Sequence, residues 1–172
     1  MLKLLGLICI LASSTFCGNN IAKTYALRPL QLKMLRQGLQ YLETEIVFTC
    51  TPLPRAFTLA GQKLSGSIGN VFTQIGQLLL ENPLLSAKDA WLKASQNNTT
   101  SLFLKTQDKS TLEAFLGGLG QSNREEQLKQ LALVQELLNM EMERAQEESK
   151  RLVKVYNALG VSIGLMLVIV LY

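Results

Sequence analysis

The sequence contains no histidine, only three cysteines and four prolines, and only 6% aromatic residues among its 172 residues. Without histidine it lacks the residue used most often for acid–base catalysis and commonly for zinc binding, and no nucleophile lies beside an evident base. Cys9 and Cys17 lie in or beside the first apolar segment, which argues against a disulfide framework. Alternating β-branched runs are also missing. We therefore expect an all-α protein that is not an enzyme, with no catalytic residue and no metal site.

Charge is scarce as well. Charged residues make up 17% of the chain, the net charge is only +4, and no dense basic run contains aromatic residues. A nucleic-acid surface is therefore not expected. Gly117, Gly118 and Gly120 lack the G-x-G-x-x-G spacing and follow no predicted strand, so they do not indicate a phosphate loop. We expect no cofactor, no nucleic acid and no small-molecule substrate.

The longest pattern in the chain is an amphipathic helix that begins near Ser122, where Ser122 and Glu125 have the spacing of a capping box. Its apolar stripe has helical spacing and consists of Leu128, Leu131, Val134, Leu138, Met142, Ala145, Leu152 and Tyr156, with Ser149 as its one polar member. Residues 155–172 carry no charged side chain. About 18 helical residues span roughly 27 Å, which is just enough to cross a hydrocarbon core. We predict that this helix continues into a transmembrane segment at 155–172.

The first apolar segment, residues 1–20, fits either a cleaved signal peptide or an uncleaved span. Cys17 suggests a lipid-anchor site. However, signal cleavage directly before a lipid-modified cysteine needs a small residue at the preceding position, and Phe16 is too large. Only Lys3 precedes the apolar part of this segment, whereas four basic residues follow the segment, namely Lys23, Arg28, Lys33 and Arg36. The last segment follows a basic cluster of Arg144, Lys150, Arg151 and Lys154. The positive-inside rule then places the middle of the chain in the cytoplasm and both termini outside. We favour two spans, 1–20 and 155–172, and keep a secreted or lipid-anchored protein as the alternative.

Between these segments, residues 21–154 are predicted to form a cytoplasmic antiparallel six-helix bundle. A seam with 3-4-3-4 spacing follows Pro29 and comprises Leu32, Leu35, Leu39, Leu42 and Ile46. Further helices are separated by breaks at 65–67, 82–83, 96–101 and 117–120, and their predicted starts are Thr51, Ser86 with Asp89, and Asp108 or Ser110 with Glu113. The connections are short, so neighbouring helices should be antiparallel. Trp91 and Phe103 are expected in the core or at its rim.

Two sets of residues are candidates for intermolecular or interhelical contact. Gly160 and Gly164 form a G-x-x-x-G pattern, and Ser14 and Gly18 share its small-residue spacing, so we predict that the two spans pack there or pair with another copy. Glycine is also common in spans without such a role. The second set is Arg28, Arg36, Glu43 and Glu45, which form either a solvated helix face or a polar surface for a partner. Glu43 and Glu45 are two residues apart, so they do not share a helix face as a catalytic pair would.

Four motifs, in the right order, resemble the stage III sporulation protein AB family of endospore-forming bacteria. They are R-P-L-Q-L-K-M-L-R-Q-G-L-Q-Y-L-E-T-E-I at 28–46, T-P-L-P-R-A at 51–56, L-G-Q-S-N-R-E-E-Q-L-K-Q-L at 119–131 and N-A-L-G-V-S-I-G-L-M-L-V-I-V-L at 157–171. Asn123 departs from the family pattern L-G-x-S-D-R, although asparagine also caps helices. Residues 62–106 match only in helical character. The resemblance covers nearly the whole chain.

The resemblance implies a component of the channel complex between mother cell and forespore, located in the mother-cell membrane that faces the forespore. The helical domain of that family is similar to the cytoplasmic domains of inner-membrane platform proteins of type II secretion and type IV pilus machines. It therefore implies, as partners, the cytosolic assembly ATPase, the other stage III A-operon sporulation proteins, or further copies of this chain. A single domain would need such copies or partners to build an equivalent platform.

Overall fold

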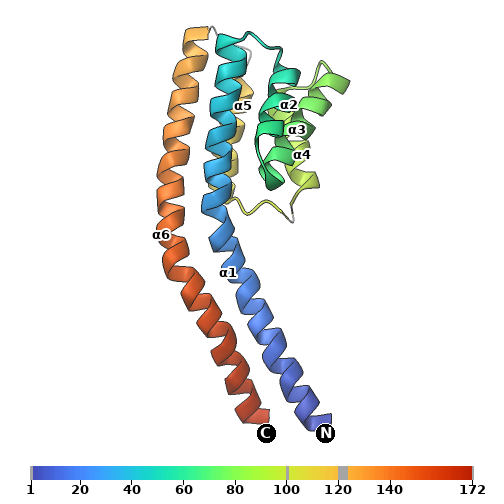
Figure 1. Cartoon of the computed structure of the whole chain (residues 1–172), viewed down its shortest axis with the longest axis vertical. Helices are drawn as coiled ribbons and strands as arrows, with labels where there is room; N and C mark the ends of the chain where they lie inside the picture. Colours follow the sequence, from blue (N-terminus) through green and yellow to red (C-terminus); the bar gives the residue numbers. More distant parts are fainter. Residues whose placement is uncertain (1, 100, 120–123, 172) are drawn as a thin grey trace. The chain divides into compact units, whose positions relative to one another are not determined.

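The computed structural model describes residues 2–99, 101–119 and 124–171, except for the side chains of residues 2–5, 7, 8, 124 and 171. Within these ranges the chain forms six α-helices, one π-helical turn and no strand (Figure 1). They are α1 (Leu2–Glu43), η1 (Thr44–Phe48), α2 (Leu53–Lys63), α3 (Gly66–Glu81), α4 (Ala87–Asn97), α5 (Thr106–Gly118) and α6 (Arg124–Leu171). The predicted all-α class is confirmed. The predicted cap at Ser122 lies outside the described residues.

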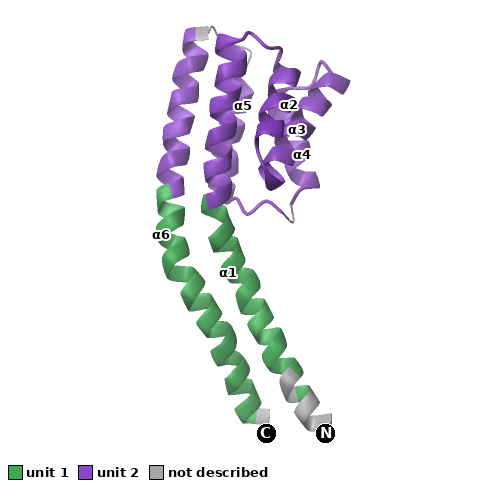
Figure 2. Ribbon diagram, viewed as in Figure 1, with its two compact units in different colours: residues 1–29, 143–172 green, residues 30–142 purple. Residues whose placement is uncertain are grey.

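The helices divide between two compact units (Figure 2). Unit 1 contains residues 1–29 and 143–172, and unit 2 contains residues 30–142. The description of all six helices as one antiparallel bundle stays a prediction, because α1 and α6 each contribute to both units. The membrane boundaries predicted at 20/21 and 154/155 also stay predictions, since a compact unit and a membrane boundary are different properties.

Unit 2 is built around the seam of α1 that the 3-4-3-4 spacing predicts. Leu32, Leu35, Leu39 and Leu42 are fully buried. The other elements contribute buried side chains that include Phe57, Ile68, Phe72, Ile75, Trp91, Leu112, Leu131 and Leu138. The ring centroids of Phe57 and Phe72 lie 5.7 Å apart. This core confirms that Trp91 is a core residue, whereas Phe103 is half-buried.

Consecutive helices of unit 2 pack against each other, α2 on α3, α3 on α4 and α4 on α5. Helices α2 and α3 approach each other closely: a Cβ atom at Gly76 would lie 2.6 Å from the carbonyl oxygen of Pro54. A side chain at this position would push the helices apart. The turn between the two helices passes through Gly66, whose φ of +67° is the left-handed conformation that glycine adopts readily. The break lies at Leu64 and Ser65, so it overlaps the predicted 65–67 only at Ser65, and Gly66 and Ser67 belong to α3.

The last member of the predicted seam is displaced by one residue, because the helix changes from α to π geometry there. Ile46, the last member of the predicted seam, is only half-buried, and Val47 is buried instead. The reason is the π-helical turn η1, which hydrogen-bonds from i to i+5 and so shifts the inward face by one residue. The same shift buries Glu45, which a continued α-helical pattern would leave at the surface.

Pro29, which the predicted seam follows, lies inside α1 and not at the start of a helix. A proline inside a helix costs about 3 kcal/mol in isolation. Packing on both sides offsets this cost: Tyr25 stacks on Tyr156 before the proline and Leu32 is fully buried after it. At the other end of the chain, α6 runs without a break from Arg124 to Leu171, as the continuous helix predicted from the sequence requires.

Candidate functional site

The glycines predicted for helix packing lie at an antiparallel crossing of α1 and α6 within unit 1. A Cβ atom at Gly18 would lie 2.8 Å from the Cα atom of Gly160 and 2.8 Å from the carbonyl oxygen of Tyr156. The Ser14 hydroxyl donates a hydrogen bond of 2.7 Å to the carbonyl oxygen of Gly160. Backbone therefore meets backbone at this crossing, which only small residues allow.

Gly164 extends the same crossing by one helical turn. A Cβ atom there would lie 3.3 Å from the Cβ atom of Ser14 and 3.0 Å from a methyl group of Leu11. An open groove of about 630 Å³ runs beside the crossing, and its walls include Cys9, Ser13, Cys17, Ile21, Leu159 and Ile163. All four residues predicted for span packing thus meet in one place. Whether they do so inside a membrane stays a prediction.

The rest of the helix pair in unit 1 is held by aromatic and ionic contacts. The rings of Tyr25 and Tyr156 are stacked with centroids 5.4 Å apart. The Arg28 guanidinium, which is 3% exposed, forms an ion pair of 3.2 Å with Glu148. The order of these contacts, from Ser14 with Gly160 to Arg28 with Glu148, shows that the two helices run antiparallel. Both ends of the chain therefore lie at the same end of unit 1 (Figure 1).

The outer surface of α6 in unit 1 is apolar. Exposed side chains here include Val161, Ile163, Leu165, Met166, Leu167, Ile169 and Val170, of which Ile169 and Val170 are more than 70% exposed. Among the described residues, one helix is long and apolar enough to cross a membrane: α6, whose apolar window is 11% buried. The first predicted span includes residues whose side chains are not described, so it stays a prediction.

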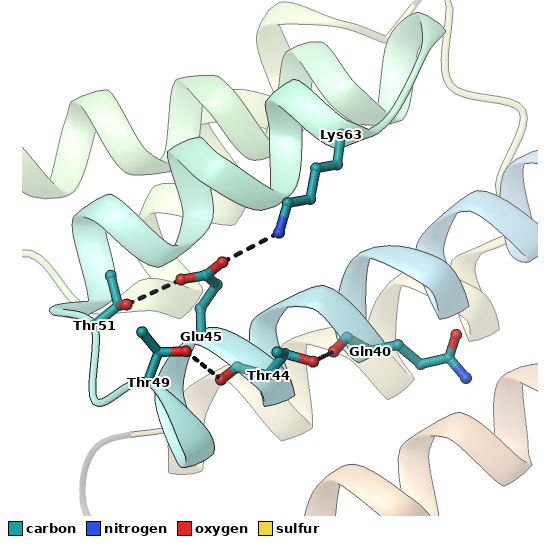
Figure 3. Close-up of polar contacts among 6 residues, drawn as sticks. All are labelled: Gln40, Thr44, Glu45, Thr49, Thr51 and Lys63. Carbon is teal, nitrogen blue, oxygen red and sulfur yellow. Dashed lines mark hydrogen bonds and ion pairs between the residues drawn. The ribbon is translucent and has the colours of Figure 1, made fainter.

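A polar cluster occupies the corner of unit 2 where α1 ends (Figure 3). The carboxylate of Glu45 accepts a hydrogen bond of 2.9 Å from the Thr51 hydroxyl and one of 3.2 Å from the Lys63 ammonium. The Thr51 hydrogen bond, followed by that of Lys63, holds the pKa of Glu45 below its usual value, although partial burial acts in the opposite direction. The Lys63 ammonium also lies 5.3 Å from the centroid of the Tyr41 ring. Glu45 thus ties η1 to α2.

Of the four residues predicted for partner docking, each makes an intramolecular contact. Arg28 and Glu45 are buried and paired as described above. Arg36 donates a hydrogen bond to the side-chain oxygen of Asn139, and Glu43 accepts one of 3.0 Å from Gln135. Arg28 belongs to unit 1 and the other three to unit 2. A partner that contacts them stays a prediction.

Nothing in the described part of the chain forms a group of three or more His, Cys, Asp or Glu side chains that could hold a metal ion. The arrangement offers apolar surface, a close helix crossing and internally paired charges. Sequence patterns missed the Glu45 cluster, because Thr51 and Lys63 lie six and eighteen residues after Glu45 and follow no helical period.

Comparisons with known proteins agree with the sequence motifs. The family model described as stage III sporulation protein AB matches residues 3–172. The chain is 33% identical over 174 residues to stage III sporulation protein AB of Bacillus subtilis (strain 168), with 99% of both chains covered. A solved structure of stage III sporulation protein AB is similar with a TM-score of 0.65 and 29% identity, and the match covers 72% of this chain and 96% of that one. These matches confirm the family predicted from the motifs: the chain belongs to the stage III sporulation protein AB family.

Proposed function

We propose that this protein is a non-enzymatic membrane component of the sporulation channel, or secretion-like complex, between mother cell and forespore. Its two terminal segments span the membrane, and its helical domain is a cytoplasmic platform. The platform docks the cytosolic assembly ATPase, other stage III A-operon proteins or further copies of this chain. The family assignment supports the sporulation role, and the resemblance to secretion and pilus platform domains supports the platform role.

The observation that carries the membrane part of the proposal is the exposed apolar surface of α6. Seven large apolar side chains between Val161 and Val170 are at least 42% exposed. Apolar patches of this extent on a water-soluble protein are unusual, and lipid would remove them from water. The partner helix α1 also exposes Phe16, by 64%. The helix pair is therefore best explained as a pair of spans.

The antiparallel pairing in unit 1 supports the same topology. Both ends of the chain lie at one end of the helix pair (Figure 1). Two antiparallel spans place both termini on one side of a membrane, and the basic residues that flank the spans, such as Lys23 and Lys154, favour the cytoplasmic side for the region between them. The 630 Å³ groove beside the Gly18–Gly160 crossing is open to a further span.

Replacing Ile163 with arginine tests the proposal. Ile163 is half exposed near the middle of the last span and lines the groove beside the helix crossing, so the change places a charge in lipid without replacing any of the small residues at the crossing. A central arginine costs about 3 kcal/mol, against roughly 0.5 kcal/mol gained from each strongly apolar residue of the span. We expect Ile163→Arg to lose membrane retention and complex assembly, measured by carbonate-resistant fractionation and co-purification.

The matched control is Leu84→Arg, which adds the same charge at a leucine that is 97% exposed in unit 2. It should leave fractionation unchanged. Unchanged fractionation of Ile163→Arg would contradict the proposal. Mass spectrometry of the mature wild-type N-terminus separates the alternative: an intact Lys3 supports the first span, whereas its loss supports a secreted or lipid-anchored protein with a cleaved signal.

A further inference from the structure

An apolar strip on α6 faces outward from unit 2. Leu133, Leu137 and Met140 are exposed by 61%, 40% and 43%. Their spacing places them on one face of the helix over about 10 Å. The core face of the same helix is a different one, because Leu131 and Leu138 are buried. A surface helix normally turns polar side chains outward, so this strip indicates a contact with another molecule.

A groove of about 480 Å³ lies beside the strip, between α5 and α6. Its walls are Ser110, Thr111, Ala114, Phe115 and Gly118 from α5, and Gln130, Leu133, Val134 and Leu137 from α6. The hydroxyls of Ser110 and Thr111 donate to the carbonyl oxygen of Gln107, at 2.9 and 3.0 Å, so they bond within their own helix. The groove thus offers mainly apolar surface, in the size range of pockets that bind side-chain anchors.

The part of α6 that belongs to unit 2 is mildly acidic, although the whole chain has a net charge of +4. Residues 124–142 contain four glutamates, namely Glu125, Glu126, Glu136 and Glu141, against two basic residues, Arg124 and Lys129. Glu136 is exposed next to Leu137 in the sequence and lies along the edge of the strip. Charge complementarity therefore favours an occupant whose apolar face is flanked by basic side chains.

The same charges disfavour a second copy of this chain as the occupant. Two copies with their strips packed in parallel would place Glu136 of one opposite Glu141 of the other, as in a coiled coil. Antiparallel packing about the middle of the strip would bring the two Glu136 side chains close together. Like charges at such positions oppose association.

We propose that the groove and strip, together the α5–α6 face, dock an amphipathic α-helix of a cytosolic partner protein. Apolar side chains of that helix fill the groove and cover Leu133, Leu137 and Met140, and its lysine or arginine side chains lie beside Glu136. This is helix-in-groove recognition, in which anchors repeat at i, i+4 and i+7. The inference rests on the proposed function, because it requires the domain to lie in the cytosol, and it adds the contact surface and the chemistry of the partner.

Site-specific photocrosslinking tests this in a sporulating host that makes the full-length protein. The photoreactive residue p-benzoylphenylalanine replaces Leu133 or Leu137, with Leu84, another exposed leucine of unit 2, as the control position. We expect a discrete adduct from the first two positions only. Mass spectrometry should map the adduct to a partner segment that has an apolar stripe flanked by lysine or arginine.

A charge reversal sharpens the test. Glu136→Lys should reduce the adduct about tenfold, whereas Glu81→Lys, also an exposed glutamate of unit 2, should leave it unchanged. No adduct, an adduct with a second copy, an adduct with lipid, or a partner segment without basic residues would each overturn the proposal.

Fractionation of the same cells separates the two proposals. If the protein resists carbonate extraction but gives no adduct, the docking inference alone fails. If the protein is found in the soluble fraction, the proposed function fails.

Discussion

At the scale of single residues, the helix pair in unit 1 depends on the absence of side chains. Gly18 is buried, and its missing Cβ allows the backbone of α6 to approach. Gly6, in the same helix, has nothing within 4 Å of where a Cβ would lie. The two glycines can therefore be compared directly: a neighbouring helix occupies the space beside Gly18, and the space beside Gly6 is open.

Gly18→Ala is expected to destabilise the helix pair by about 1–3 kcal/mol, because the new methyl group would meet the backbone of Gly160 and Tyr156 and would push the helices apart. Gly6→Ala should have no such cost and gain up to about 1 kcal/mol of helix propensity. The measurement is the midpoint of denaturation by SDS in mixed micelles. Equal midpoints for the two variants would show that the crossing is not a close one.

Glu45 is the residue whose charge state matters most in the corner cluster of unit 2. The Thr51 and Lys63 contacts lower its pKa in the folded protein, so the charged form stabilises the fold. That stabilisation is fully present above the unfolded pKa of about 4.3 and is lost as the pH falls through the lowered folded pKa. The folded protein should therefore weaken at acid pH partly through this residue.

Glu45→Gln should be less stable than wild type at pH 7, and the difference should shrink as the pH falls below about 4. Thr51→Val, which removes the larger cause of the shift, should lose part of the same difference. Urea unfolding of the detergent-solubilised chain between pH 7 and pH 3 measures both. A constant offset between wild type and Glu45→Gln across this range would contradict the assignment.

At the scale of elements, the turn from α-helix to π-helix at Thr44–Phe48 decides which side chains reach the core. Val47 is 2% exposed, whereas Ile46 is half-buried. We expect Val47→Ala to cost roughly 2 kcal/mol, and Ile46→Ala to cost less although it removes one more carbon. Chemical denaturation of the two variants measures this. The reverse order would indicate a regular α-helix through this region.

The outcome at η1 shows where sequence patterns stop being informative. Leu32, Leu35, Leu39 and Leu42 are buried as their spacing predicts, because a regular helix repeats its geometry. The π turn has no such period. Glu45, within this turn, contacts Thr51 and Lys63, and Lys63 at the end of α2 becomes a neighbour only after α2 folds back.

The caps show the same limit at the ends of helices. Ser86 accepts from the amide of Asp89, as its local spacing predicts, because both partners lie within one turn. For α5, the predicted starts at Asp108 and Ser110 are both too late: Lys105 is the N-cap, and Asp108 lies in the first turn, where its carboxylate accepts from the amide of Lys105. The small residues of the helix pair were found by spacing alone, but Tyr25 and Tyr156, 131 residues apart, carry no local signal that they stack.

At the scale of the whole molecule, the proposed topology places unit 2 in the cytoplasm and both termini outside. Cys50 reports on this directly, because it is exposed in unit 2. In a Cys9→Ser, Cys17→Ser background, a membrane-impermeant maleimide should label Cys50 only after the cells are permeabilised. Labelling in intact cells would place the helical domain outside and would contradict the topology.

The Ser14–Gly160 contact has a consequence for how the protein is made, since it joins residues 146 positions apart. Ribosomes deliver the chain from its N-terminus, so all of residues 30–142 emerge before Gly160 does. The N-terminal part of α1 therefore has no partner helix during most of translation, and the helix pair forms last. A premature stop codon after residue 142 would therefore remove the α6 helix of this pair and leave the α1 helix without its partner.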